Sequence, residues 1–295
     1  MTPLLFISLV VSANAAAQYS DSFARNFMFP LSAAAYSDRP QQCIERLFPN
    51  STLQRLVTVQ CDAFRKDTCS GFTAVLHPQK AIVLSFRYPL RASQYIHISI
   101  GGRAGGTARF LQLLQEVNKT IFLNLSSWLF GGRISRYFSD AFSKIWSAGM
   151  NVDFHTLRSR HPDYEIWVTG HSLGGSVASL AASFLIGSHI ANSSEIKLVT
   201  FGQPRTGDVK YSATHDAQME YSFRVTHWRD IVPHIPFGPL GGYFHHRQEV
   251  ILGKNKRKGE GKECSDGLWF TSSIHEHTHY FGKKVSEYGR AGCVE

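Results

Sequence analysis

Residues 170–174 of this chain, Gly-His-Ser-Leu-Gly, have the types and spacing of a nucleophilic serine site. They fit the pattern Gly-x-Ser-x-Gly, in which the serine occupies a sharp turn between a strand and a helix. The apolar run that ends at Thr169 predicts the strand, and the small residues from Gly175 predict the helix. Glycines avoid collisions at such a turn, and the amide of Leu173, at the helix N-terminus, can donate a hydrogen bond to a developing oxyanion. We predict that Ser172 is the nucleophile.

A serine nucleophile requires a general base, and the base requires a carboxylate that orients it. In a fold with this turn, the order along the chain is serine, then acid, then histidine. The best acid is Asp230, because it follows an apolar run of strand length and so can reach the catalytic edge of a sheet. Asp208 and Asp216 compete with it, but they lie in polar loop sequence, where solvated carboxylates are the usual outcome.

Three histidines near the C-terminus could supply the base: His275, His277 and His279. The sequence pattern alone does not choose among them. Alternating histidines, with another pair at 245–246, are also compatible with a metal site. However, no His-x-x-x-His pair with a glutamate on a plausible helix accompanies them, and no set of cysteine partners does. We therefore expect neither a metal nor a cofactor.

The elements that must position these residues are apolar runs of strand length alternating with helix-like stretches. The predicted strands are 73–77, 81–86, 165–169, 196–201 and 221–226, of which the first two form a hairpin. The predicted helices are 137–146, 154–160 and 176–186. Apolar strands that alternate with helices are typical of parallel sheets. We predict an α/β fold with a mostly parallel central sheet and helices on both faces.

The composition indicates a large buried core, since 43% of the residues are hydrophobic and 18% are charged. We find no internal repeat, and we predict one domain at 18–295. Residues 1–17 are predicted to be a signal peptide, because an apolar run at 4–11 precedes small residues at Ala13, Ala15 and Ala17. This run is shorter than the ~20 residues of a membrane span, and no later run is long enough. We therefore expect a soluble, secreted protein.

Other sequence features fit an exported protein. Four sequons place glycosylation candidates at Asn50, Asn118, Asn124 and Asn192. Five cysteines occur without a Cys-x-x-Cys pair, which favours disulfides over a redox or metal role. The formal net charge is +9, but no nucleic-acid motif accompanies the basic run at 254–258. We interpret that run as a solvated loop, with a patch for anionic lipid or a polyanion as the alternative.

Four motifs together make the sequence similar to the fungal-type, or class 3, lipase family over about Leu31 to Cys293. They are Val-Thr-Gly-His-Ser-Leu-Gly-Gly at 168–175, Phe-Gly-Gln-Pro-Arg-Thr-Gly at 201–207, Asp-Ile-Val-Pro at 230–233 and His-Thr-His-Tyr-Phe-Gly at 277–282. The resemblance implies an α/β-hydrolase fold that hydrolyses acylglycerols or related carboxylic esters, at a lipid interface and without a cofactor. It also implies the roles of nucleophile for Ser172, orienting acid for Asp230 and base for His277.

The resemblance extends to neighbouring residues. The family's final motif is Asp-His-x-x-Tyr-Phe, and Glu276 stands here in place of its Asp, which is not a member of the triad. The family's cysteine pattern implies two disulfides, Cys43 with Cys293 and Cys61 with Cys69. It leaves Cys264 as the candidate free thiol.

One segment departs from the family pattern. Family members follow the strand that ends near Phe86 with Phe-Arg-Gly-Ser/Thr, whose last amide completes the oxyanion hole, whereas this chain has Tyr88-Pro89 after Phe-Arg. Proline has no amide hydrogen to donate. The family pattern resumes at Gly106-Thr107, so we interpret 88–105 as an insert and Thr107 as the second oxyanion residue. The insert is either a surface excursion or an unspliced segment of the gene model.

Two questions stay open at the level of sequence. The apolar stretch at 120–130 is either a lid or acyl-contact surface, or ordinary core. The same triad would also serve a phospholipase or an aryl-ester esterase, and the disturbed segment after Phe86 is compatible with a catalytically weakened, lipid-binding relative.

Overall fold

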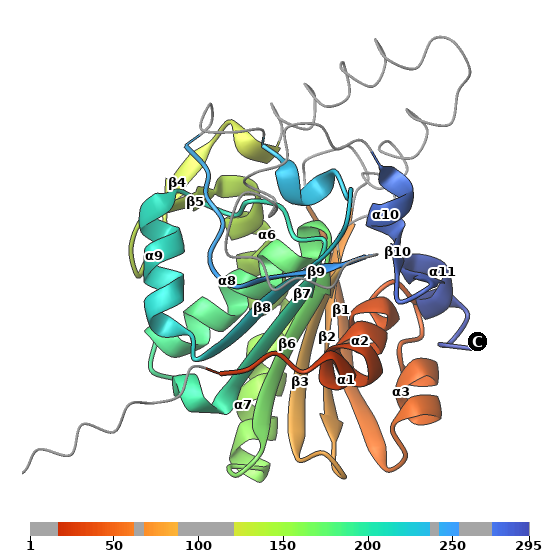
Figure 1. Cartoon of the computed structure of the whole chain (residues 1–295). Coiled ribbons are helices and arrows are strands. Elements are labelled where there is room, and N and C mark those ends of the chain that lie inside the picture. The colour runs from red at the N-terminus through yellow and green to blue at the C-terminus, as the bar shows by residue number, and fades with distance from the viewer. Residues whose placement is uncertain (1–16, 62–67, 88–120, 237–241, 254–272, 295) are drawn as a thin grey trace, which may run out of the picture.

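A seven-stranded sheet forms the centre of the structure (Figure 1). The computed structural model describes residues 17–61, 68–87, 121–236, 242–253 and 273–294. In their order across the sheet, the strands are β1 (Ser51–Gln60), β2 (Thr68–Leu76), β3 (Ala81–Arg87), β6 (Glu165–His171), β7 (Ile196–Phe201), β8 (Tyr221–His227) and β9 (Glu249–Leu252). The pairs from β3 to β9 are parallel, whereas β1, β2 and β3 pair antiparallel. The predicted mostly parallel sheet is confirmed.

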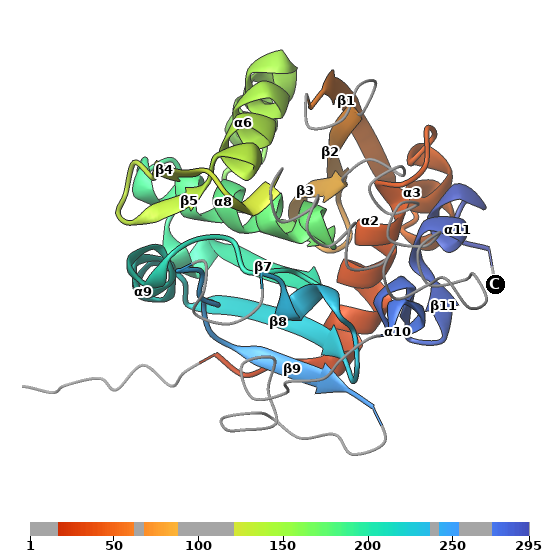
Figure 2. The same ribbon diagram turned by 90° about the horizontal axis from the view of Figure 1, so that it is seen from above.

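Helices cover both faces of this sheet (Figure 2). One face packs against α6 (Arg136–Ile145), α7 (Asn151–Arg160) and α8 (Leu173–Gly187), and the other against α2 (Phe29–Ala34), α3 (Gln41–Leu47) and α11 (Val285–Arg290). Strand β3 shows why both faces need cover. Ile82, Leu84 and Phe86 are buried in the first core, while Ala81 and Val83 are buried in the second, as the alternation of side chains along a strand requires.

The remaining elements connect or flank these layers. They are α1 (Asp21–Phe23), α9 (Val209–Gln218), α10 (Ile274–Thr278), the pair β4 (Leu125–Ser127) and β5 (Arg133–Ser135), and the pair β10 (His279–Tyr280) and β11 (Lys283–Lys284). Short π-helical or 3-10 segments lie at 24–28, 146–150, 193–195 and 232–234. Helix α9 lies beside α8. The hydroxyl groups of Tyr211 in α9 and Ser179 in α8 form a hydrogen bond of 2.7 Å.

Two disulfides hold the chain at the positions that the resemblance implies. Cys43 in α3 is bonded to Cys293 after α11, across a sequence separation of 250 residues, and Cys61 is bonded to Cys69 at the start of β2. The predicted free thiol, Cys264, lies outside the described residues. So do Thr107, the sequon residue Asn118 and the segments 1–16, 88–105 and 254–258.

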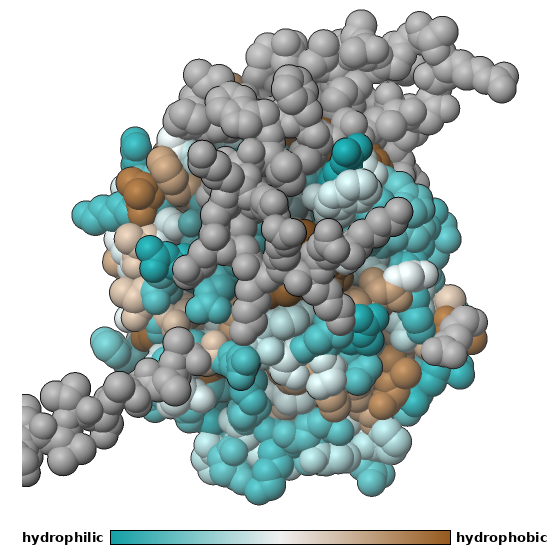
Figure 3. All heavy atoms as spheres, in the orientation of Figure 1, coloured by the Kyte–Doolittle hydropathy of each residue, from teal (hydrophilic) through white to brown (hydrophobic). Residues whose placement is uncertain are grey.

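The described residues on the face shown in Figure 3 are mostly hydrophilic, with smaller hydrophobic areas among them. Asn50, Asn124 and Asn192 are exposed. In the ranges given above, no helix combines the length and the apolar character that a membrane crossing requires. The apolar stretch near 120–130 is divided: Ile121, Phe122 and Trp128 are buried in the core, whereas Leu123 and Leu129 are 62% and 77% exposed.

Candidate active site

Ser172 lies at the sharp turn between β6 and α8. Its backbone has φ 60° and ψ −134°, a conformation that is strained for a residue with a side chain. The turn brings backbones so close that only glycine fits beside it. A Cβ atom on Gly170 would lie 2.3 Å from the carbonyl oxygen of Gly174, and one on Gly174 would lie 2.4 Å from that of Phe86. These contacts place the serine at the carboxyl-terminal edge of the sheet, directly beside the end of β3.

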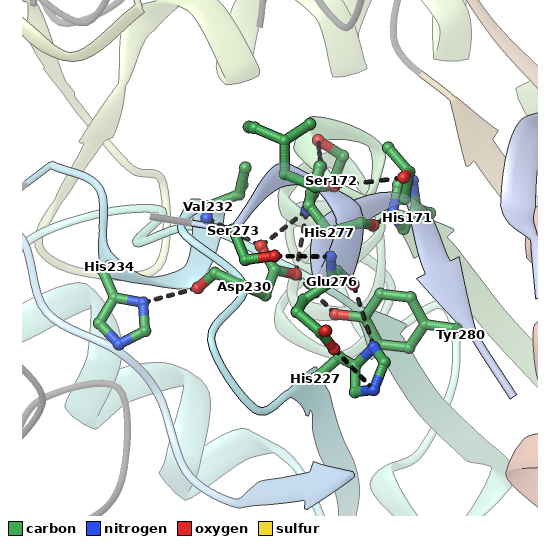
Figure 4. A network of polar contacts seen from close by, with 12 residues as sticks. His171, Ser172, His227, Asp230, Val232, His234, Ser273, Glu276, His277 and Tyr280 are labelled. Carbon is green, nitrogen blue, oxygen red and sulfur yellow. Dashed lines mark hydrogen bonds and ion pairs between the residues drawn. The ribbon is translucent and has the colours of Figure 1, made fainter. Parts of the chain in front are cut away.

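Three predicted residues that are far apart in the sequence converge at this edge (Figure 4). The hydroxyl oxygen of Ser172 lies 2.8 Å from Nε2 of His277. Nδ1 of His277 lies 2.9 Å from Oδ1 and 3.0 Å from Oδ2 of Asp230. Because parallel strands end at the same edge, the residues after β6 and β8 meet there, and α10 brings the histidine between them.

The environment of Asp230 keeps it ionised. Burial alone raises the pKa of this carboxyl, which is 1% exposed, but the charge and hydrogen bond of His277, together with hydrogen bonds from Tyr280 and Val232, lower it below its ordinary value. The Tyr280 hydroxyl, 2.7 Å from Oδ2, and the Val232 amide, 2.9 Å from Oδ1, donate further hydrogen bonds. Four interactions thus hold one buried carboxylate in place behind the imidazole.

The neighbours of the triad leave little room. Gly202 follows β7 with φ +57°, and a Cβ atom there would lie 2.8 Å from Oδ2 of Asp230 and 3.0 Å from the His277 ring. The ring of His171 stacks on that of His277 with centroids 4.7 Å apart. Nδ1 of His171 lies 2.8 Å from the hydroxyl of Tyr36, so the turn that follows α2 also supports the site.

The structure separates the candidates that the sequence left open. His275 is exposed, and the ring of His279 lies against the carbonyl of His275 rather than against Ser172. We expected Asp208 and Asp216 to be solvated, but both carboxylates have partners within the protein. Asp208 lies at the N-terminus of α9, where its carboxylate accepts a hydrogen bond from the Tyr211 amide, and it also pairs with Arg133. Asp216 accepts a hydrogen bond from the Arg247 amide. Both carboxylates are thus engaged with groups outside the triad.

Several supporting residues were not assigned a role from the sequence. Tyr280 lies in the final motif, and His171 lies inside the Gly-x-Ser-x-Gly motif, so both positions carried a signal. Tyr36 carried none, because a tyrosine 135 residues before its partner is joined to it only by the fold.

A second histidine cluster has the spacing of metal ligands. His215, Asp216 and His246 offer ligand atoms that all lie within 4.8 Å of one another. Two of these residues already have partners: Nε2 of His246 lies 2.9 Å from the Gln203 amide nitrogen and 3.1 Å from the Ser179 hydroxyl, and Asp216 accepts a hydrogen bond from the Arg247 amide. The ring nitrogens of His215 are buried without a hydrogen-bond partner among the described residues, and the ring stacks on that of His246. Burial, together with the nearby charge of Arg224, lowers the pKa of both histidines. We assign no metal-binding role to this cluster, because binding there would cost the existing hydrogen bonds and face that cation.

The arrangement as a whole can carry out nucleophilic catalysis. An imidazole 2.8 Å from a serine hydroxyl can accept its proton, and a buried carboxylate on the opposite ring nitrogen stabilises the resulting imidazolium ion. The amide of Leu173 begins α8 directly after the serine, at the positive end of the helix dipole.

Comparison with known proteins finds lipases. The family described as "Lipase (class 3)" matches residues 104–239. A lipase of Caenorhabditis elegans is 32% identical over 319 residues, which cover 94% of this chain and 83% of that relative. A lipase of Rhizomucor miehei is 30% identical over 162 residues, which cover 52% of this chain and 44% of that relative.

Solved structures share the fold. Lipase II from Rhizopus niveus superimposes with a TM-score of 0.72 at 21% identity, and the superposition covers 95% of this chain and 99% of that one. Because the two sequences are only 21% identical, this structural similarity is evidence for the fold alone. The predicted α/β-hydrolase architecture is confirmed.

Proposed function

The chain belongs to the class 3 lipase family and is a carboxylic ester hydrolase, and on this premise we propose that it is a secreted serine lipase. In this proposal it hydrolyses acylglycerol or related ester bonds through Ser172, Asp230 and His277. The single observation that carries the proposal is the unbroken chain of hydrogen bonds from the serine hydroxyl through the imidazole to the carboxylate, at 2.8 Å and 2.9 Å.

The reaction proceeds by acyl transfer in two steps. His277 takes the proton of Ser172 through Nε2, and the serine oxygen attacks the ester carbonyl. Asp230 stabilises the imidazolium ion that forms, and His277 then protonates the departing alcohol, which leaves an acyl group on the serine. In the second step the same imidazole activates a water molecule, which releases the fatty acid and restores the serine.

Two backbone amides are proposed to bind the oxyanion. The Leu173 amide is the first, since it directly follows the nucleophile at the start of α8. The second is that of Thr107, which lies outside the described residues and is assigned from the sequence pattern. Replacing Thr107 with proline, which lacks the amide hydrogen, is expected to lower kcat about 10²–10³-fold. Sequencing the transcript would show whether the insert at 88–105 belongs to the mature protein.

Secretion is proposed from features of the described residues and of the sequence. Disulfides such as Cys43–Cys293 persist in oxidising compartments, and Asn50, Asn124 and Asn192 are exposed as glycosylation requires. Expression of the full chain in a eukaryotic secretory host tests this. Recovery of the protein from the medium, with a mass that falls on glycosidase treatment, is the expected result. Retention of the protein inside the cells without glycans would contradict it.

Hydrolysis of a chain-length series of p-nitrophenyl esters and of an acylglycerol emulsion tests the activity. We expect the wild type to hydrolyse both, and Ser172→Ala to lose about 10⁶-fold in kcat. A folded wild type that hydrolyses no ester in either set would favour the lipid-binding relative. Faster hydrolysis of phospholipid vesicles than of acylglycerol would favour a phospholipase, and activity on short aryl esters alone would favour an aryl-ester esterase.

A further inference from the structure

The helix that carries His277 is held to the sheet by imidazole groups. Helix α10 has only five residues, and the last carbonyl groups of a helix lack partners within it. Nε2 of His171, at the end of β6, lies 2.8 Å from the carbonyl oxygen of His277. Nδ1 of His227, at the end of β8, lies 3.2 Å from the carbonyl oxygen of Glu276 and 2.6 Å from that of His279. Two strands thus hold the C-terminal end of this helix.

The ring of His227 has a hydrogen-bond acceptor at each nitrogen. Nδ1 faces the two carbonyl oxygens, and Nε2 lies 2.9 Å from the carboxylate of Glu276 (Figure 4). A carbonyl and a carboxylate only accept, so each nitrogen needs a hydrogen to make its bond. Neutral imidazole carries one such hydrogen and imidazolium carries two. The imidazolium ion is therefore the form of His227 that satisfies both contacts.

The same residue also contacts the part of the chain that presents the acid. The carbonyl oxygen of His227 accepts a 2.7 Å hydrogen bond from the Asp230 amide, which closes the turn before that carboxylate. Its ring lies 5.7 Å from the ring of Tyr280, whose hydroxyl donates to Asp230. His227 is thus in contact with both supports of the triad, the turn that carries the acid and the helix that carries the base.

We propose that His227 is a positioning residue. As an imidazolium ion bound to the Glu276 carboxylate and to the carbonyl oxygens of Glu276 and His279, it keeps His277 aligned with Asp230 and Ser172. This inference rests on the proposed function, because it assumes that these three residues form the catalytic triad. It gives Glu276 a task at the position where the resembling family has Asp. The acid supplies the negative partner that the second N–H of His227 requires.

The proposal predicts a particular dependence of the rate on pH. His277 acts as the base in its neutral form, whereas the contacts of His227 require the imidazolium ion. A neutral His227 would have a hydrogen on only one ring nitrogen, so it could not donate both to the carbonyl oxygens and to Glu276, and the rate is expected to fall at high pH, where the ring is neutral. In the part of the chain that the structure describes, the titratable groups facing His227 are Glu276 of α10 and Tyr280 of β10, with His275 near Glu276 at 3.9 Å.

Substitutions at position 276 separate charge from shape. Glu276→Gln keeps the length of the side chain, and its amide can donate to a neutral Nε2, so the fall in kcat at high pH should disappear. Glu276→Ala removes the partner and should lower kcat about tenfold with KM little changed, because the base is no longer held in line. Glu276→Asp retains the charge and should keep the wild-type profile. His275→Ala, at an exposed neighbouring position, is the matched control and should leave kcat unchanged.

The experiment measures kcat and KM against pH for these variants, together with ring-nitrogen NMR of the histidine-labelled protein. His227 signals are assigned by their loss in His227→Gln. Two protonated ring nitrogens on His227 at the pH of maximal rate, and loss of the alkaline fall in Glu276→Gln, are the expected results. A neutral His227 at that pH, or wild-type profiles for both Glu276→Gln and Glu276→Ala, would overturn the proposal.

The NMR measurement is repeated on Ser172→Ala, where it needs no activity. It therefore reports the charge on His227 even if the chain fails to hydrolyse any ester. Failure of hydrolysis by the wild type would refute the proposed function, whereas failure of the ring-nitrogen result would refute this inference.

Discussion

The nucleophile and the base of this site are held in place in different ways. Ser172 is fixed by its immediate neighbours in the chain, since a Cβ atom on Gly170 would meet the backbone of Gly174. His277 lies on a helix of five residues that is held by side chains from β6 and β8, 49 to 106 residues away along the chain. The comparison shows that local backbone geometry presents the serine, whereas tertiary contacts align the histidine with it.

The largest expected effect comes from breaking the support of the base. Asp230→Asn keeps the size of the side chain but lets an amide face Nδ1 of His277, which favours the tautomer that cannot accept the serine proton. We expect kcat to fall about 10⁴-fold. Kinetics with a soluble ester, alongside a circular dichroism spectrum that shows an intact fold, measure this. Activity within tenfold of the wild type would contradict the assignment of the acid.

Removing the disulfide that holds the chain after α10 tests the tertiary support at a distance. The Cys43–Cys293 bond closes a loop of 250 residues, and replacing both cysteines with alanine should lower the free energy of unfolding by about 2–5 kcal/mol. Denaturant unfolding measures the change. Cys264→Ser is the control, because we predict that thiol to be free. An equal loss in the control would contradict the predicted pairing.

Crowding the turn tests the local support of the nucleophile. In Gly170→Ala the new Cβ atom would lie 2.3 Å from the Gly174 carbonyl oxygen, so we expect a loss of about 3 kcal/mol in the free energy of unfolding. Gly175→Ala is the milder comparison, since its nearest contact would be 3.1 Å, to a side-chain atom of Gln203. Thermal unfolding of both variants checks the order. Equal stability of Gly170→Ala and the wild type would show that the turn is not tightly packed.

The smallest expected effect comes from one donor to the acid. The Tyr280 hydroxyl is among the groups that lower the pKa of Asp230, so Tyr280→Phe should raise that pKa toward its ordinary value. A lowered pKa in the folded state stabilises the protein above the unfolded-state pKa, and this contribution is lost as pH falls through the folded-state value. In the variant the loss of stability should therefore begin at a higher pH, and kcat should fall about tenfold.

The pH dependence of the unfolding temperature measures the effect of Tyr280→Phe on stability. Tyr288→Phe offers a matched control, because Tyr288 lies at α11 and stacks on Phe29 instead. The prediction is wrong if both variants lose stability at the same pH as the wild type.

The same contrast explains how much could be predicted from the sequence. The strands β6, β7 and β8 are apolar runs with polar ends, and the predicted starts at 165, 196 and 221 agree with the structure. The turn at Ser172 has a signature of five consecutive residues. Helix α9, with the polar sequence Val-Lys-Tyr-Ser-Ala-Thr-His-Asp-Ala-Gln, lacks a clear apolar stripe, and it was not predicted.

The tertiary part of the site was less accessible. Three histidines within five residues have the same chemistry, and only their placement in the fold distinguishes them. His277 is 2% exposed and lies beside Ser172, whereas the side chain of His275 is 72% exposed. The contacts of His171 and His227 with α10 join residues that are 49 to 106 positions apart, for which one sequence carries no local pattern. The resemblance to a family, not the periodicity, singled out His277.

Covalent labelling tests the central claim most directly, that one serine is activated by the imidazole beside it. The wild type is treated with a fluorophosphonate, and the modified residue is located by mass spectrometry of proteolytic peptides. We predict one equivalent of label on Ser172, and a labelling rate that collapses in His277→Ala while Ser172→Ala takes up no label. Labelling of a different residue, or a folded wild type that does not react, would contradict the account.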